Sequence, residues 1–484
     1  MRIAVINVSG PLSSDGSRLI SALLKRAGHH VKTVFLARRE PLEYGHDELE
    51  QLDEILKETD LVMIAVYSSY AVRAVQVTEF VHRKYPGMKV FWGGPHCISV
   101  PDLGLRHADG VCFSEGDQVV VDLVSKMEAG IDHLDTPNMA FNVDGAPSVN
   151  RALPPFSDLD SLPYYDYDLD DQFVLDRELS PMTQDMLREY LVSYPYHIPI
   201  LYFVTSRGCP YACSYCNNCR YIAMFGKNTM RFHTVDRVID ELEHILEHFD
   251  FFKFVGFGDD DFFMRPKREL EDFAQKYKKR VRLPFGIAVS ARTYRKDKIE
   301  ILLGCGLRVV QMGVQSGSQR VLDRVYNRQI QVVKTKDVVH QIEPYHRTHG
   351  LDFLLDFIID NPYETKEDII QTFYYIVDLP PYVTVNLFFL AFFPGTPIYD
   401  RALEDGIIQP FDEKEFRFIN RGSLRYQKNY ETWLILMLRY LRRHRRLRRY
   451  IPLAPLRALG GGPMRAVASV FPESFYSFLS RIVR

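Results

Sequence analysis

The sequence predicts an α/β protein. It begins with an amino-terminal doubly wound, flavodoxin- or Rossmann-like parallel sheet, continues with a partial (β/α)6 TIM-like barrel, and ends in a helical carboxyl-terminal extension. Three observations support this. The 484 residues exceed what one hydrophobic core usually organises. Apolar strand patterns alternate with amphipathic helix patterns in two separate series. A Pro-rich break separates the two series, and the alternation stops near residue 410.

The first series occupies residues 1–135. Amphipathic stretches such as residues 16–29 and 46–60 separate five apolar runs. This alternation is typical of an open parallel sheet, whose ligand crevice lies beyond the carboxyl ends of the strands. The residues at these ends are small, polar or glycine, which suits either a ligand site or ordinary turns. The runs are residues 2–8, 30–37, 61–68, 89–94 and 110–116.

Residues 136–195 lose the periodicity. Their segment 146–168 is rich in Pro, Asp and Tyr. This composition favours an extended linker that crosses a domain surface.

The second series occupies residues 196–410 and contains six apolar runs with helical patterns between them. Six βα units without the last two of a full barrel predict an opened barrel, with its chemistry on loops at the carboxyl ends of the strands. The runs are residues 198–206, 251–258, 283–291, 307–317, 351–360 and 383–393.

Four of the seven cysteines lie in "SRGCPYACSYCNNC", residues 206–219, directly after the first of these six runs. An odd, clustered set of cysteines is not a disulfide framework and indicates metal chemistry in a reducing compartment. A structural zinc site would need a second Cys or His pair, which is not found downstream. A ferredoxin-type cluster uses four cysteines in a different order of spacings.

The stretch "GCPYACSYC" resembles the CxxxCxΦC motif of the radical S-adenosylmethionine (SAM) superfamily, with Tyr215 at the aromatic position. The resemblance implies that Cys209, Cys213 and Cys216 hold a [4Fe-4S] cluster whose fourth iron binds SAM, and that Tyr215 lies at the SAM site. Cys219 is then a bystander. A structural or electron-transfer cluster is the alternative.

Three further motifs resemble the same family in the expected order. "GFGDDDFF" is similar to the DDxF pattern of the cobalamin-associated branch and implies SAM contacts by Asp259 and Asp260. "SARTY" offers Ser290 and Arg292 to the SAM ribose and carboxylate. "GVQSGSQRVLDRVYNR" is similar to the GxExGS element, with Gln315 in place of the more frequent Glu; an amide can still hydrogen-bond ribose hydroxyls.

The first domain resembles the B12-binding domain of that branch, which implies bound cobalamin. The Asp-x-His-x-x-Gly motif is absent, since the sequence reads "NVSGPLSSDG" after the first run. No histidine there can ligate cobalt from below, and His96 is better suited to cap its own loop or touch the cofactor edge. A sheet that has lost its cofactor is the alternative. The expected cobalamin contacts are Ser9, Ser68, Ser69, Gly93, Gly94, Glu115 and Gly116.

The resemblance implies a 5'-deoxyadenosyl radical and methylcobalamin, and hence a C-methyltransferase that acts on an unactivated carbon of a small-molecule or lipid-like substrate. A flavodoxin or ferredoxin would supply the electron. The alternative within the same machinery is a cyclisation or rearrangement without net methyl transfer. A different class is a non-catalytic iron-sulfur and corrinoid binding protein or sensor.

The carboxyl-terminal region, residues 411–484, contains seven arginines between Arg439 and Arg449. A basic amphipathic helix can lie on an anionic membrane, so residues 431–484 are a candidate for peripheral membrane contact. The alternative is a helix packed on the barrel with its arginines in solvent or ion pairs.

No nucleic acid is expected, because the arginines lack interleaved aromatics and the formal net charge is -2. The amino terminus alternates into a strand rather than continuing as a signal-peptide core. We therefore expect a cytoplasmic protein, with the inner face of the membrane as the site of any peripheral contact.

Overall fold

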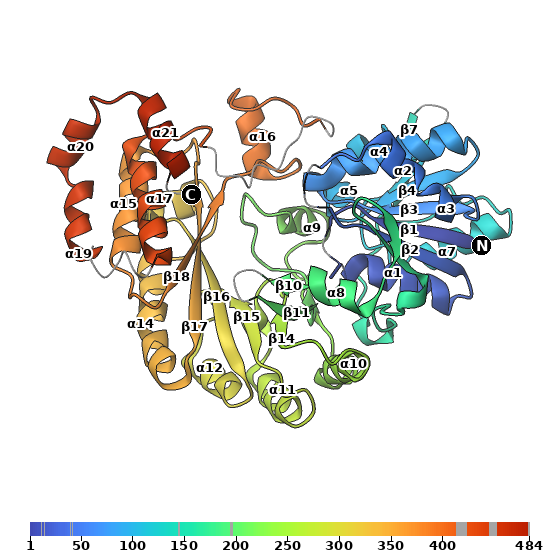
Figure 1. Cartoon of the computed structure of the whole chain (residues 1–484), viewed down its shortest axis with the longest axis horizontal. Helices are drawn as coiled ribbons and strands as arrows, with labels where there is room; N and C mark the ends of the chain where they lie inside the picture. The colour runs from blue at the N-terminus through green and yellow to red at the C-terminus, as the bar shows by residue number, and fades with distance from the viewer. Residues whose placement is uncertain are drawn as a thin grey trace.

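A computed structural model describes residues 1–10, 12–13, 15–38, 40, 42–143, 146–193, 197–412, 424–444 and 453–482. It contains two large sheets with helices packed on them. Figure 1 shows the amino-terminal sheet on one side, the second sheet in the centre, and the last helices on the far side.

The amino-terminal sheet is built around five parallel strands in the order β5-β4-β3-β1-β2, which is the flavodoxin-like order that the sequence predicts. These strands are nearly continuous apolar runs because helices cover both faces of the sheet. The strands are β1 (Arg2–Asn7), β2 (His30–Leu36), β3 (Leu61–Ala65), β4 (Lys89–Gly93) and β5 (Gly110–Cys112). The helices are α1 (Asp15–Arg26), α2 (His46–Glu50), α3 (Asp53–Leu56), α4 (Ala71–Lys84), α5 (Pro95–Ser99), α6 (Pro101–Gly104) and α7 (Val120–Glu128), with the 3-10 turn η1 (Ser68–Tyr70).

Residues 136–193 differ from the expected linker, because they add four short strands to both edges of this sheet. The strand β8 pairs in parallel with β2, and the other three pair antiparallel. Proline and aspartate keep these strands short, which hides their pattern in the sequence. The elements are β6 (Met139–Val143), β7 (Ala146–Val149), η2 (Leu159–Ser161), η3 (Leu169–Asp171), β8 (Gln172–Leu175), β9 (Leu179–Pro181) and α8 (Gln184–Tyr190).

The second sheet confirms all six expected strands, which run in parallel and in sequence order, with the short antiparallel β10 (Val192–Ser193) at one edge. We call this curled sheet and its helices the half-barrel. The strands are β11 (Ile198–Phe203), β14 (Phe254–Phe257), β15 (Phe285–Val289), β16 (Leu307–Gln315), β17 (Asp352–Ile359) and β18 (Thr384–Phe389). The outer helices are α10 (Val235–His248), α11 (Lys267–Arg280), α12 (Lys296–Leu303), α14 (Val332–His349) and α15 (Lys366–Val377).

Two helices on the half-barrel side of the molecule pack against the amino-terminal domain: α13 (Gln319–Arg324) and α16 (Pro397–Glu404). Their buried side chains, such as Leu322 and Tyr399, share one apolar cluster with Val66 and Trp92 of the first domain. The two domains therefore pack directly on each other.

The helix α17 (Tyr430–Arg443) packs against α15 and β18 (Figure 1), with Leu434, Ile435 and Leu438 buried. The buried side chain of Arg442 on this helix donates to four backbone carbonyls, one in the last turn of α15 and three after it, including Leu379 O at 3.2 Å. These contacts agree with the packed-helix alternative for α17.

Four of the seven clustered arginines, at positions 445, 446, 448 and 449, lie outside the described residues. The last elements are α19 (Leu453–Leu456), η5 (Arg457–Gly460), α20 (Gly462–Ala468) and α21 (Glu473–Ile482). Among the helices that the structure describes, none combines the length and apolar character needed to cross a bilayer.

Candidate active site

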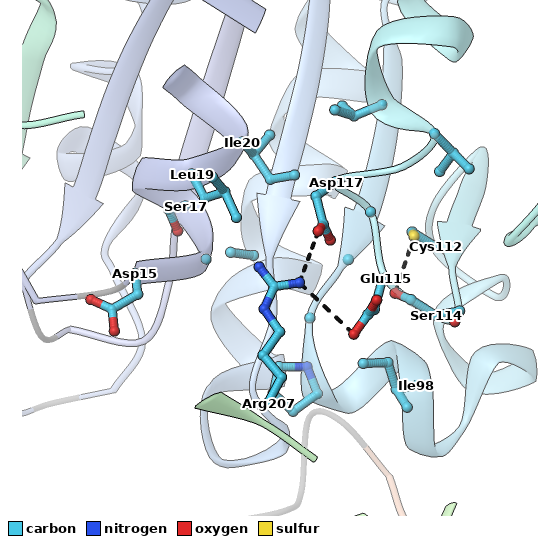
Figure 2. A pocket seen from close by; sticks show the side chains of 18 of the residues that line it. Asp15, Ser17, Leu19, Ile20, Ile98, Cys112, Ser114, Glu115, Asp117 and Arg207 are labelled. Atoms are coloured by element: carbon cyan, nitrogen blue, oxygen red, sulfur yellow. Dashed lines mark hydrogen bonds and ion pairs between the residues drawn. The ribbon is translucent and has the colours of Figure 1, made fainter. Parts of the chain in front are cut away.

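A cavity of about 450 Å³ lies where the two domains meet (Figure 2). Its walls include the loops at the carboxyl ends of β3, β4 and β5 and the loops that follow β11 and β14. Ligand sites of open parallel sheets and barrels occupy these strand ends. Here the strand ends of both sheets open into the same cavity.

The part of the cavity that lies between α1, α7 and the first sheet is apolar. Apart from Asp15 and Ser17 at the start of α1, most of its wall is formed by apolar side chains of both helices and of the central strands. They include Val5, Leu19, Ile20, Phe91, Val120 and Leu123. Such a wall suits a bulky organic group better than a metal ion or a phosphate.

Three of the expected cobalamin contacts line the rim of this cavity: Gly93, Gly94 and Gly116. Gly94 has a φ of +99°, and a Cβ there would lie 2.9 Å from the carbonyl oxygen of Val66. Only glycine fits this turn, which brings backbone rather than side chains to the cavity.

The three expected serine contacts lie outside the cavity lining. The hydroxyl of Ser9 donates to Oδ1 of Asn7 at 2.6 Å. Ser68 Oγ lies 3.0 Å from Nδ1 of the fully buried His96, and Ser69 is half-buried. Both Ser9 and Ser68 therefore stabilise their own loops, as expected for His96, and a cofactor contact by these serines stays a prediction.

The fourth group in the cavity wall, Glu115, is buried and pairs with an arginine of the half-barrel. Its carboxylate forms an ion pair with Arg231 at 2.8 Å and accepts a hydrogen bond from the backbone N–H of Phe156. The neighbouring Asp117 pairs with Arg207 at 2.8 Å (Figure 2). These two ion pairs, which we call the interdomain clamp, join the loop after β5 to the half-barrel.

The cysteine loop starts at the short ribbon of β12 (Ser206–Arg207) and β13 (Arg231–Phe232) and ends at α9 (Asn218–Phe225). Gly208 has a φ of +89°, and a Cβ there would lie 2.4 Å from the carbonyl oxygen of Thr229. Glycine is therefore required directly before the first cysteine, because no side chain fits against the ribbon.

Cys209 and Cys216 are half-buried and Cys213 is buried. Burial raises the pKa of both the Cys209 and the Cys216 thiols to about 12, and the neighbouring cysteines add to the rise. Among the described residues, no three His, Cys, Asp or Glu side chains are gathered for a single metal ion. Three thiols on one loop suit a larger iron-sulfur cluster, in which each thiolate would bind a different iron.

Cys219 belongs to the first turn of α9, and its N–H donates to Cys216 O at 3.1 Å. Cys219 therefore lies on the helix that follows the loop, and it is not part of the three-cysteine motif.

Tyr215 packs its ring edge-on against Tyr326, with the centroids 5.0 Å apart. Its hydroxyl accepts a hydrogen bond from Nη1 of Arg328 at 2.5 Å. Tyr215 lies outside the cavity lining and connects the cysteine loop to the segment that follows α13.

The three aspartates after β14 have three different environments. Asp259 is buried and accepts hydrogen bonds from Thr205 and Ser206 at the end of β11; burial raises its pKa. Asp260 lines the cavity and accepts from Asn218 at 2.9 Å. Asp260 is exposed to solvent, but the surrounding protein partly desolvates its carboxylate and raises its pKa. Asp261 accepts from Thr293 at 2.7 Å, and burial raises its pKa to about 6.

The remaining SAM candidates lie at the ends of β15 and β16. Ser290 accepts from the N–H of Arg292 at 3.2 Å, and the exposed guanidinium of Arg292 lies 4.6 Å from the ring of Tyr211 in the cysteine loop. Gln315 has a φ of +71° beside a register shift in β16. A non-glycine residue in this conformation is strained, and such strain gathers at functional sites.

Two family models match the chain. The model of the B12 binding domain matches residues 1–124, and the model of the Radical SAM superfamily matches residues 203–376. The chain belongs to the cobalamin-binding radical SAM family. It is a radical SAM enzyme, and the cofactors of the two families are cobalamin, SAM and a [4Fe-4S] cluster. The apolar wall and glycine rim fit cobalamin, and the three thiols of the cysteine loop fit the cluster.

Two curated relatives are methyltransferases. An uncharacterised methyltransferase of Pyrococcus horikoshii is 24% identical over 366 residues, which span 75% of this chain and 73% of the relative. The 2-(S-pantetheinyl)-carbapenam-3-carboxylate methyltransferase of Streptantibioticus cattleyicolor is 26% identical over 214 residues, which span 42% of this chain and 28% of the relative.

Two solved structures share the fold. The radical SAM methyltransferase TsrM from Kitasatospora setae, solved with cobalamin and a [4Fe-4S] cluster, has a TM-score of 0.64 at 17% identity and covers 84% of this chain and 78% of its own. The cobalamin-dependent SAM radical enzyme OxsB has a TM-score of 0.62 at 14% identity and covers 84% of this chain and 55% of its own.

Sequence reasoning missed the basic residues around the site. Arg207 and Arg231 form the clamp, and Arg328 contacts the cysteine loop. Arg207 stands two residues before Cys209, and Arg328 ends the quoted "GVQSGSQRVLDRVYNR" stretch. Their position beside a motif was the only indication of a role in the site. Single arginines are too common in sequences for this position to identify them.

Proposed function

We propose that this enzyme is a C-methyltransferase that acts on an unactivated carbon of a small-molecule or lipid-like substrate. The observation that supports it most directly is the shared cavity, whose wall contains both Gly93 and Gly116 of the cobalamin domain and Gly208 and Asp260 of the half-barrel. When bound, SAM and cobalamin would supply a carbon-centred radical and a methyl group in one enclosed space. TsrM, which has been solved with its tryptophan substrate, and the relatives named above are methyltransferases.

The residues of the chain would divide this work. Cys209, Cys213 and Cys216 would hold the cluster. Tyr215, Asp259, Asp260, Ser290, Arg292 and Gln315 are the proposed SAM site, of which Asp260 reaches the cavity itself. The side chain of Asp259 would act indirectly, since its hydrogen bonds hold the end of β11 in place.

One anaerobic experiment tests the proposal. The chain is reconstituted with iron, sulfide and hydroxocobalamin, reduced by a flavodoxin or ferredoxin, and its SAM-derived products are counted. Methyl transfer yields S-adenosylhomocysteine together with 5'-deoxyadenosine. A rearrangement yields 5'-deoxyadenosine alone and would replace the proposal; a sensor yields neither in turnover.

We also propose that the end of the chain contacts an anionic membrane surface, through the later part of the expected region, residues 431–484. The apolar face of α17 is buried on the half-barrel, whereas the segment from α20 to α21 exposes a set of large apolar side chains. The exposed fractions of Val470, Val467 and Phe478 are 82%, 61% and 60%. Residues 439–484 contain eleven arginines and one acidic residue, which matches an anionic lipid surface.

Vesicle flotation tests this contact. We expect the protein to float with phosphatidylglycerol vesicles and to stay below with phosphatidylcholine vesicles. The triple variant Phe471→Ser, Phe475→Ser and Phe478→Ser should lose the binding, and Val333→Ser, which changes an exposed apolar residue on α14, should keep it. Equal flotation of wild type and triple variant would remove the proposal.

A further inference from the structure

Arg328 is a cation beside the cysteine loop, and no carboxylate in the described part of the chain neutralises it by direct contact. Its Nη1 lies 4.0 Å from Sγ of Cys213, and its Nη2 donates to the carbonyl of Gly313 at 2.6 Å. Among the described residues, no ion pair includes Arg328, and its Nε is buried without a hydrogen-bond partner. A part-buried charge without a counter-ion is costly, so a counter-ion is expected nearby.

The guanidinium is held in one orientation. Tyr215 accepts from Nη1, and the ring of Tyr215 is fixed against Tyr326, whose own hydroxyl accepts from Asn361 at 3.1 Å. A Cβ at Gly313 would lie 3.0 Å from Nη2, so glycine at this position lets the guanidinium approach the strand. These contacts hold Nη1 next to the second cysteine of the loop.

Asp356 is a carboxylate close enough to Arg328 for the two charges to interact. Burial raises the pKa of Asp356, and the charge of Arg328 offsets part of the rise. The two oxygens of Asp356, however, accept hydrogen bonds from Gln311 at 2.7 Å and Asn386 at 3.0 Å. The amides of Gln311 and Asn386 thus bind both oxygens of Asp356, and Arg328 makes no direct contact with this carboxylate.

We propose that Arg328 is the counter-cation of the iron-sulfur cluster and raises its reduction potential. A [4Fe-4S] cluster held by three thiolates is anionic, and reduction adds one electron from the external reductant, with no bond formed or broken. A fixed positive charge next to Cys213 stabilises the more negative, reduced form more than the oxidised form. Local charge and hydrogen bonds to sulfur are the means by which proteins set the potentials of such clusters.

This inference rests on the cluster and not on methyl transfer, so each can fail without the other. The test uses the full chain, reconstituted anaerobically, and follows the reduced cluster by electron paramagnetic resonance during a redox titration. In Arg328→Met we expect the ratio of reduced to oxidised cluster at a fixed potential to fall about tenfold, which is about 59 mV for one electron.

Arg328→Lys keeps the charge and should recover most of the loss. Tyr215→Phe keeps the arginine but removes one of its anchors, and should shift the potential in the same direction by less. Arg280→Met is the matched control, because Arg280 pairs with Asp240 and Glu243 on the outer surface of the half-barrel. It should leave the potential unchanged.

A kinetic readout separates a change of potential from a loss of structure. SAM cleavage by Arg328→Met should fall more with a flavodoxin as reductant than with titanium(III) citrate, a much stronger reductant. An unchanged potential in Arg328→Met with full iron content would overturn the proposal. If Arg328→Met takes up no iron, the neutral Arg328→Gln is titrated instead: a lower potential supports the proposal, and a wild-type potential overturns it.

Discussion

The two sheets contribute different kinds of surface to one cavity. The amino-terminal sheet contributes shape: glycine turns at 93, 94 and 116 and an apolar wall between α1 and α7. The half-barrel contributes charged groups, namely Asp260, Arg207 and Arg231, and its cysteine loop adjoins the cavity at Gly208. Both have parallel strands that end at the cavity, so strand topology alone does not explain the difference.

The difference follows from what each domain holds. Cobalamin is large and is held mainly by the fit of a preformed space, for which an absent side chain matters as much as a present one. A cluster is held by covalent ligands, and its charge requires compensation by the protein. The four predictions below test this contrast, from the largest expected effect to the smallest.

The ligand side of the contrast predicts the largest effect. Replacing Cys209, Cys213 or Cys216 by Ala should reduce bound iron and SAM cleavage to background, because the cluster then lacks one of its three thiolates. Cys219→Ala is the matched control and should keep both. Iron content and 5'-deoxyadenosine formation are the measurements, and loss of iron in Cys219→Ala would favour a four-cysteine cluster.

Because the amino-terminal domain is expected to hold cobalamin by the shape of its cavity, one added side chain there should exclude the cofactor. A Cβ at Gly116 would contact Ile20 and Cys112 at 3.5 and 3.6 Å, which is ordinary packing, so Gly116→Leu should fold and extend into the cavity. We expect an absorbance titration to show about a 100-fold loss of affinity for hydroxocobalamin. This corresponds to a cost of about 3 kcal/mol for overpacking the cofactor site. Cluster content should not change.

Gly87→Leu is the control for this substitution, because nothing lies within 4 Å of a Cβ at the turn before β4. Wild-type cobalamin affinity in Gly116→Leu would show that the cofactor is held elsewhere.

The interdomain clamp predicts a stability effect where the two regions meet. Arg231→Met would leave the buried Glu115 with only the longer, 3.8 Å contact to Arg207, and should lower the free energy of unfolding by about 3 kcal/mol. Urea denaturation followed by circular dichroism measures it. Arg280→Met, which removes an exposed ion pair at the outer surface, should have a much smaller effect, because solvent screens such pairs. Equal effects of the two variants would mean that the clamp adds nothing beyond a surface ion pair.

A buried carboxyl in the half-barrel predicts the smallest effect. Burial raises the pKa of Glu364 to about 8. The folded state then binds more protons than the unfolded state above the usual glutamate pKa, so stability falls as the pH rises from there towards 8. Between pH 6 and pH 8 the wild type should lose about 2 kcal/mol relative to Glu364→Gln, which has no proton to release.

Urea midpoints at the two pH values measure this loss. The control Glu367→Gln changes an exposed neighbour and should follow the wild type. A wild type and Glu364→Gln with parallel pH profiles would contradict the raised pKa.

The sequence determined the order of both parallel sheets and the cysteine loop. Long apolar runs separated by amphipathic helices determine locally where strands form and in which direction they run. A motif such as "GCPYACSYC" is complete within nine residues, so it can be recognised without the fold. The edge strands β6 to β9 were not predicted because they are short, and because β8 and β6 pair with the much earlier strand β2 and with β5.

Only the tertiary structure decided which candidate side chains face the cavity. Asp259 and Asp260 are neighbours in the sequence, yet one is buried under Thr205 and the other lines the cavity. The contact of Arg328 with Cys213 joins residues 115 positions apart. No local pattern encodes such contacts, because they arise from how whole elements pack. The sequence predicts the cofactor ligands, and packing decides the charges around them.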